Sequence, residues 1–192
     1  CFLRSDDPTD VVSPILIAFA AGSGYGFGCV VRMKGRRDSW TMTQFAAWLL
    51  EGGFTGVLRL RSDSETSIQS VAQHIASVRT APTIVETTPV GSSNSLGCCE
   101  RWAGTLAGMV RSQRLDLEVR FEIALKSTDA LFPWLVQHAV FLYNRCHVRH
   151  SGETPYKARQ ERDYHGQWFS FGTVVYARVP EAVDQGKLEA RW

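Results

Sequence analysis

The chain has 192 residues, of which 44% are hydrophobic and 21% are charged. This composition excludes a wholly disordered protein and allows one domain with an appendage, or two small domains. The net charge is only +2, so the chain as a whole is not a polycation. Its longest apolar run, residues 14–21, is too short to span a bilayer, and we expect no membrane partner.

The basic residues are more informative than the net charge. Arginine outnumbers lysine by 17 to 4, and arginine is the side chain that holds phosphate groups in bidentate fashion. A solvated charged surface would explain a basic cluster equally well when the cluster is considered alone. Five residues are nevertheless candidates for nucleic-acid contacts, four of them in one cluster: Arg32, Lys34, Arg36, Arg37 and, further along the chain, Arg145.

The five cysteines form no Cys-x-x-Cys pair, so neither a disulfide framework nor a zinc knuckle is indicated. We therefore expect a protein of a reducing, intracellular compartment, nuclear or cytoplasmic. The sequence opens at Cys1 rather than at a methionine, as expected of a piece of a longer chain.

In chain order, the polar residues 1–13 predict a linker. The apolar run 14–21 and residues 25–33 predict two hairpin-paired strands. The pattern Thr41-x-x-Gln44 predicts a capped helix that ends at Gly52. Alternating strands and helices follow, as a strand at 57–60, a helix from about Ile68, a strand at 83–87, a Pro/Gly/Ser/Asn loop at 88–96, and helices at 97–117 and 133–145. This order predicts a mixed sheet with helices on its faces.

The domain organisation expected from this pass has four parts. Residues 1–13 form a linker, 14–150 a core domain, 151–167 a basic connector, and 168–192 the beginning of a small β unit.

Two carboxylates occupy positions where a site could form. Asp63 follows the apolar strand at 57–60, and Glu100 begins the helix at 97–117, with 36 residues between them. Strand ends and helix starts meet at one edge of an α/β sheet, and two carboxylates there would repel without a cation. Mg²⁺ takes such oxygens and retains water for substrate phosphates. The alternative is purely structural, with Asp63 capping a helix and Glu100 stabilising a first helical turn.

Four stretches together resemble the integrase core of retroelements, most closely copia-type and related retrotransposon integrases. They are LRLRSDSETSI, TTPVGSSNSLGCCERWAG, PWLVQHAVFLYNRCHVRHSGETPY and FGTVVYARVP, and the resemblance covers about residues 14–180. It implies an RNase H-like fold, a mixed five-stranded sheet flanked by helices, followed by the start of a small β-barrel-like unit. It also implies DNA integration by metal-dependent strand transfer as part of a polyprotein.

The same resemblance implies a three-carboxylate site for Mg²⁺ or Mn²⁺, in which Asp63 and Glu100 match the second and third acids. At the position corresponding to the first acid we find Ala20, and no acid occurs between Val11 and Arg37. Loss of one ligand removes charge and a coordination position from an ion with strict octahedral demands. We therefore expect a weakened or lost metal site and impaired or absent catalysis.

Further residues are candidates for contact with DNA, the partner that the resemblance implies together with self-association into multimers. On the helix at 97–117, small residues share a face with Glu100 and Arg111, which would let DNA approach while Arg111 contacts phosphate. Ser93 and Asn94 in the preceding loop could touch a DNA end. The main alternative is a non-enzymatic nucleic-acid-binding or assembly module that keeps the RNase H-like fold. A third interpretation is an RNase H-like nuclease, against which the loop-to-Glu100 spacing and the stretch Thr154-Pro155-Tyr156 argue.

Overall fold

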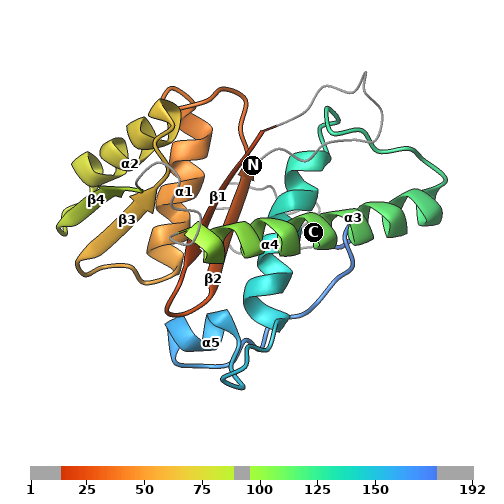
Figure 1. Ribbon diagram of the computed structural model, residues 1–192. Coiled ribbons are helices and arrows are strands. Elements are labelled where there is room, and N and C mark those ends of the chain that lie inside the picture. Colours follow the sequence, from red (N-terminus) through yellow and green to blue (C-terminus); the bar gives the residue numbers. More distant parts are fainter. Residues whose placement is uncertain (1–13, 89–95, 177–192) are drawn as a thin grey trace, which may run out of the picture.

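The computed structural model describes residues 14–88 and 96–176, which form four strands and five helices (Figure 1). A hairpin of two long strands lies at the centre, with helices on both sides. The elements in chain order are β1 (Ile15–Ala20), β2 (Tyr25–Val30), α1 (Ser39–Glu51), β3 (Leu58–Ser62), α2 (Thr66–Val78), β4 (Thr83–Thr87), α3 (Gly97–Phe121), α4 (Phe132–Cys146) and α5 (Pro155–Gln160). The predicted elements up to 145 are therefore present, with ends that differ by a few residues.

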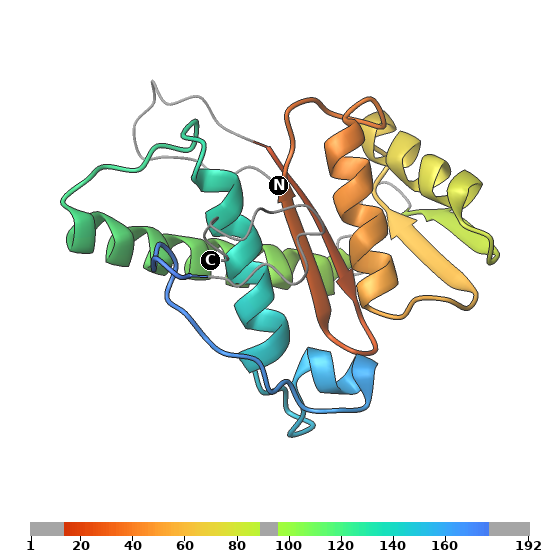
Figure 2. The same ribbon diagram turned by 180° about the vertical axis from the view of Figure 1, so that it is seen from behind.

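The central hairpin separates two apolar layers. β1 and β2 pair antiparallel, from Ile15 opposite Val30 to Ala20 opposite Tyr25. Because successive side chains of a strand point to opposite faces, alternate residues of the hairpin pack against different helices. One face packs with the buried side chains of α3 and α4, and the other packs with those of α1. Viewed from behind, the hairpin lies between α1 and α4 (Figure 2).

Two glycines of β2 explain why α3 and α4 lie so close to the hairpin. A Cβ atom at Gly26 would lie 2.7 Å from the Trp102 ring, and one at Gly28 would lie 2.6 Å from a Leu106 methyl group. Both distances are shorter than real Cβ contacts, so only glycine permits this approach. The Trp102 indole then donates a hydrogen bond of 2.8 Å to the Phe27 carbonyl.

The second strand ends earlier than the sequence predicts, at Val30 rather than residue 33. The backbone N–H of Arg32 donates to a carboxylate oxygen of Asp38 at 2.8 Å, so the chain turns away. Asp38 is also the N-cap of α1, where its carboxylate accepts from the N–H and the hydroxyl of Thr41. The cap predicted at Thr41 is therefore wrong by three positions, and Thr41 is a donor to the real cap.

The strands do not form the expected five-stranded sheet. β3 and β4 are parallel, joined through α2, and within the described ranges the strands make two separate two-stranded sheets. Leu58 and Leu60 of β3 pack against the same apolar cluster as Leu16 and Ala18 of β1. The two sheets thus share the helical layer that contains α1 and Ile75 of α2, but not a hydrogen-bonded ladder.

The C-terminal part is packed differently from the prediction. Residues 168–176 contain no strand, and residues 177–192 lie outside the described residues, so the expected β-barrel-like unit is not observed in the part described. Phe171 instead packs against the α3–α4 cluster, and a His138 ring nitrogen lies 3.1 Å from the Phe169 carbonyl. The predicted linker at 1–13 also lies outside the described residues.

Among the helices of residues 14–88 and 96–176, none combines the length and the apolar character that crossing a membrane requires.

Candidate metal and nucleic-acid site

Asp63 lies directly after the C-terminal end of β3 and is exposed. Its carboxylate accepts a hydrogen bond of 3.1 Å from the backbone N–H of Glu65, the N-cap residue of α2. The parallel strand β4 ends beside it, where the Thr88 N–H donates to the Ser62 carbonyl at 2.8 Å. Asp63 therefore stabilises the turn before α2 and does not cap this helix, whose N-cap is Glu65, and its exposed carboxylate lies at the end of β3.

Glu100 lies in the first turn of α3 and is also exposed. The half-buried thiol of Cys99 precedes it, and burial raises the pKa of Cys99 to about 11, with further contributions from the neighbouring Cys98 and from the negative charges of Glu100 and Asp63. Both carboxylates thus act electrostatically on one thiol. The two acids are separated by 36 residues in the sequence.

The donors at this edge fit a hard divalent cation in kind but not in number. Carboxylate oxygens are the ligands that Mg²⁺ prefers, whereas the raised pKa of Cys99 keeps its thiol protonated and a poor ligand. Within residues 14–88 and 96–176, no group of three His, Cys, Asp or Glu side chains could hold a metal ion. Of the described residues, Asp63 and Glu100 could contribute two ligands.

Ala20 does not lie at this edge. The start of β1, not its end, borders the beginning of α2, since Ile15 and Leu16 line one pocket together with Glu65 and Ser67. Ala20 follows Ile15 by five residues of extended strand, roughly 16 Å at about 3.3 Å per residue. The prediction that Ala20 occupies the place of a lost carboxylate beside Asp63 is wrong in this structure, because β1 runs away from the Asp63 end of β3.

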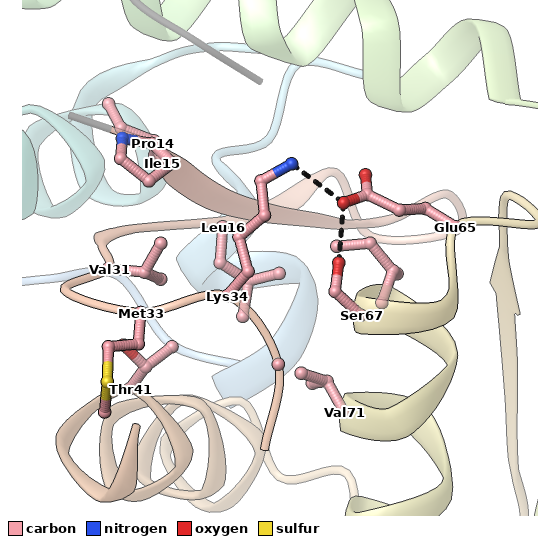
Figure 3. Close-up of a pocket in the computed structure, with 12 residues that line it drawn as sticks. Pro14, Ile15, Leu16, Val31, Met33, Lys34, Thr41, Glu65, Ser67 and Val71 are labelled. Carbon is pink, nitrogen blue, oxygen red and sulfur yellow. Dashed lines mark hydrogen bonds and ion pairs between the residues drawn. The ribbon is translucent and has the colours of Figure 1, made fainter. Parts of the chain in front are cut away.

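The basic cluster lies next to the turn that contains Asp63. Lys34 forms an ion pair of 2.9 Å with Glu65, whose carboxylate also accepts from the Ser67 hydroxyl at 2.6 Å (Figure 3). These two contacts hold the pKa of Glu65 below its usual range. The predicted nucleic-acid residues Arg32, Lys34, Arg36 and Arg37 are all exposed, so the cluster is a cationic surface beside the carboxylate edge.

Arg111 lies on the open face of α3 that begins at Glu100. Arg111 and Gly104 are exposed, and a Cβ atom at Gly104 or at Gly108 would meet nothing within 4 Å. The small residues are therefore not needed for packing between helices in the described residues. Ser93 and Asn94, the other candidates for contact with a DNA end, lie outside the described residues.

Arg145 is committed to contacts inside the protein. Its side chain is only 11% exposed and is paired with Glu51. The guanidinium carbon lies 4.1 Å from the centre of the Phe141 ring and 5.2 and 5.1 Å from the rings of Tyr156 and Tyr164. The Arg145 guanidinium thus packs between aromatic rings of α4, α5 and the connector. It is therefore not available for a contact with phosphate.

Asn144, next to Arg145, has a role that the sequence analysis missed. It is 2% exposed, accepts a hydrogen bond of 2.7 Å from the Gly26 N–H, and donates one of 2.8 Å to the Gly26 carbonyl. It thus satisfies the outer edge of β2 as a neighbouring strand would. The sequence signal was weak, because α4 carries a second amide, Gln137, that is only half-buried.

Comparisons with known proteins do not identify a family. No family model matches the chain, and no curated protein matches it. Among solved structures, the chain is similar to the catalytic core domain of BIV integrase, with a TM-score of 0.47 and 18% sequence identity, over 77% of this chain and 85% of that chain.

Proposed function

We propose that this chain is an integrase-like core domain that binds DNA along α3 and the basic cluster and directs it to the carboxylates of Asp63 and Glu100. The observation that carries the proposal is the position of these two exposed acids, directly after the end of β3 and in the first turn of α3, with the basic cluster next to the Asp63 turn. The resemblance of the surrounding sequence to retroelement integrases supports the same assignment.

Each group has a defined role in this proposal. Asp63 and Glu100 would hold one Mg²⁺ or Mn²⁺, which supplies charge neutralisation at a phosphate when it is bound. Arg111, eleven residues after Glu100 on the same helix face, contacts a backbone phosphate, and Gly104 and Gly108 leave room for the DNA strand. Arg32, Lys34, Arg36 and Arg37 extend the cationic surface on the other side of Asp63.

We further propose that strand transfer by this chain is slow or absent, because two carboxylates hold an octahedral cation less well than three. Ala20 is no longer the reason, since it lies away from the site. The reason is the two-ligand set of the described residues. Self-association into multimers, expected for an integrase, remains part of the proposal.

The test compares the chain with Asp63→Asn and Glu100→Gln. Each change keeps the shape of the side chain and removes a negative charge, so binding to duplex DNA should be kept or strengthened. Addition of Mn²⁺ should raise the melting temperature of the unmodified chain and not that of either variant. A metal-dependent rise of the same size in all three proteins would show that the two acids do not hold the cation.

The second candidate function is a non-enzymatic nucleic-acid-binding or assembly module. The observation that favours it is the lack of a three-ligand group in residues 14–88 and 96–176. It predicts salt-dependent DNA binding that Mg²⁺ and Mn²⁺ leave unchanged, together with no strand transfer at any metal concentration. Metal-dependent joining of DNA ends that Asp63→Asn abolishes would exclude it.

A further inference from the structure

A cavity separates the basic turn after β2 from the beginning of α2. It is open to solvent, has a volume of about 340 Å³, and its lining contains three cationic side chains, three hydroxyl groups and no carboxylate. The lining residues are Lys34, Gly35, Arg36, Arg37, Thr66, Ser67 and Ser70. The cavity therefore offers an anion its cationic side chains and the Thr66 hydroxyl, because the Ser67 hydroxyl already donates to Glu65 and the Ser70 hydroxyl to the Ser67 carbonyl.

The turn that carries the cations is held in a fixed conformation against α2. The Arg36 N–H donates to the Ser70 hydroxyl at 3.3 Å, and this hydroxyl donates to the Ser67 carbonyl at 2.7 Å. Gly35 has φ of +88°, which L side chains rarely adopt, and a Cβ atom there would lie 3.1 Å from the Ser70 hydroxyl. The backbone thus requires glycine at this point to bring the two neighbouring arginines to the cavity.

The two arginines are the uncompensated charges of the cavity. Lys34 is bonded to Glu65, whereas Arg36 and Arg37 are exposed and form no ion pair with any carboxylate of residues 14–88 and 96–176. Adjacent cations repel each other, and a bound anion relieves this repulsion. A phosphate group accepts bidentate hydrogen bonds from a guanidinium and a single bond from a hydroxyl group, which matches the two arginines and Thr66 of this lining.

We propose that this cavity binds one phosphate group of a nucleic-acid backbone and so fixes the register of the strand beside Asp63. The inference deepens the proposed function and rests on it for the source of the phosphate. The connection to Asp63 is short, because Asp63 accepts from the Glu65 N–H at 3.1 Å and Glu65 contacts Lys34 of the cavity at 2.9 Å. A strand held in the cavity therefore lies next to the turn that contains Asp63.

Two variants test the cavity without disturbing the fold. The double change Arg36→Ala with Arg37→Ala removes both guanidinium groups and keeps the backbone bond to Ser70. Thr66→Glu adds a carboxylate to the cavity wall in the first turn of α2, where negative charge stabilises a helix. The matched control is Arg162→Ala, an exposed arginine outside the cavity.

Binding to duplex DNA is measured as a function of salt for all four proteins. The double variant should bind about ten-fold more weakly, and its log–log salt slope should fall by about one, as for the loss of one phosphate contact. Thr66→Glu should bind more weakly at an unchanged or higher melting temperature, and Arg162→Ala should stay within about two-fold of the parent. In parallel, inorganic phosphate is titrated while the amide signals of Thr66 and Ser70 are followed by NMR.

The two proposals fail in distinguishable ways. If the parent binds DNA and the double variant binds equally well, the cavity is not a phosphate site, and the proposed function keeps only the DNA path along α3. If the parent binds no DNA but inorganic phosphate shifts the Thr66 and Ser70 signals only while both arginines are present, the cavity binds free phosphate and the proposed function is overturned. If neither ligand binds, both proposals are overturned.

Discussion

Replacement of Asn144 by alanine should weaken the fold at the junction of α4 and β2. The carboxamide makes two buried hydrogen bonds to one residue, accepting from the Gly26 N–H at 2.7 Å and donating to the Gly26 carbonyl at 2.8 Å. The carbonyl has a second donor, the Trp48 indole at 2.9 Å. The N–H is left without this acceptor in Asn144→Ala, in a strand segment that is fully buried.

The expected loss of stability follows from this difference between the N–H and the carbonyl of Gly26. A buried N–H without an acceptor costs about 1–3 kcal/mol, and the loss of the second bond, whose carbonyl keeps the Trp48 donor, adds about 1 kcal/mol. We expect Asn144→Ala to lower the free energy of unfolding by about 2–4 kcal/mol, a large part of the stability of a domain of this size.

Urea denaturation followed by tryptophan fluorescence measures this loss. Gln137→Ala is the control on the same helix, because Gln137 is only half-buried and its amide makes a long contact of 3.5 Å with Gln44. The control should lose less than about 1 kcal/mol. A loss below about 0.5 kcal/mol for Asn144→Ala would refute the view that this side chain replaces a neighbouring strand.

Three further predictions concern the site and its surroundings. Ala20→Asp should restore no metal-dependent strand transfer. It should lower the free energy of unfolding by about 1–2 kcal/mol, because it places a carboxylate in the apolar cluster beside α1. Recovered strand transfer would contradict the placement of Ala20 away from Asp63. Gly104→Ala and Gly108→Ala should each stabilise α3 by about 1 kcal/mol, since an added methyl group meets nothing there. Both changes should weaken binding to duplex DNA if DNA passes along this face of α3. Binding as tight as that of the parent would exclude this path. The hydrogen bond from Arg114 holds the pKa of Glu118 below its ordinary value of 4.5. Since the pKa of Glu118 is depressed in the folded state, its contribution to the free energy of unfolding is present above pH 4.5 and is lost as the pH falls below that value. The free energy of unfolding, measured from about pH 6 to about pH 3, should therefore fall less for Glu118→Gln than for the parent.

The elements that the sequence predicted well are those that short-range patterns determine. The stripe that contains Val71 and Ile75 placed α2 correctly, because a helix with one apolar face has one stable orientation on a sheet. The apolar run at residues 14–21 and the glycine-rich turn predicted the central hairpin for the same reason. That Asp63 and Glu100 meet at one edge stays a prediction, which follows from where strands end and helices begin.

The errors concern contacts between residues that are distant in the sequence. The direction of β1 relative to β3 decides which end of β1 borders Asp63, and no local pattern encodes that direction, so Ala20 was placed at the wrong end. Arginine is a residue type that often contacts phosphate, so the sequence favours this role for Arg145. Only the structure shows that aromatic rings from α4, α5 and the connector enclose its side chain. The cap of α1 is Asp38 rather than Thr41, because the Asp38 carboxylate also accepts a hydrogen bond from the backbone N–H of Arg32 in the preceding turn.

The enclosure of Arg145 has a practical consequence for where the chain can be divided. A protein shortened to end at residue 150 would keep the guanidinium and its Glu51 partner but lose the rings of Tyr156 and Tyr164. It would expose the Phe141 side of α4, where Trp168 and Tyr164 now pack. Recombinant fragments that retain the chain through Phe171 should therefore give more soluble, folded protein than shorter fragments. We expect residues 151–171 to belong to the minimal folding unit rather than to a spacer between domains.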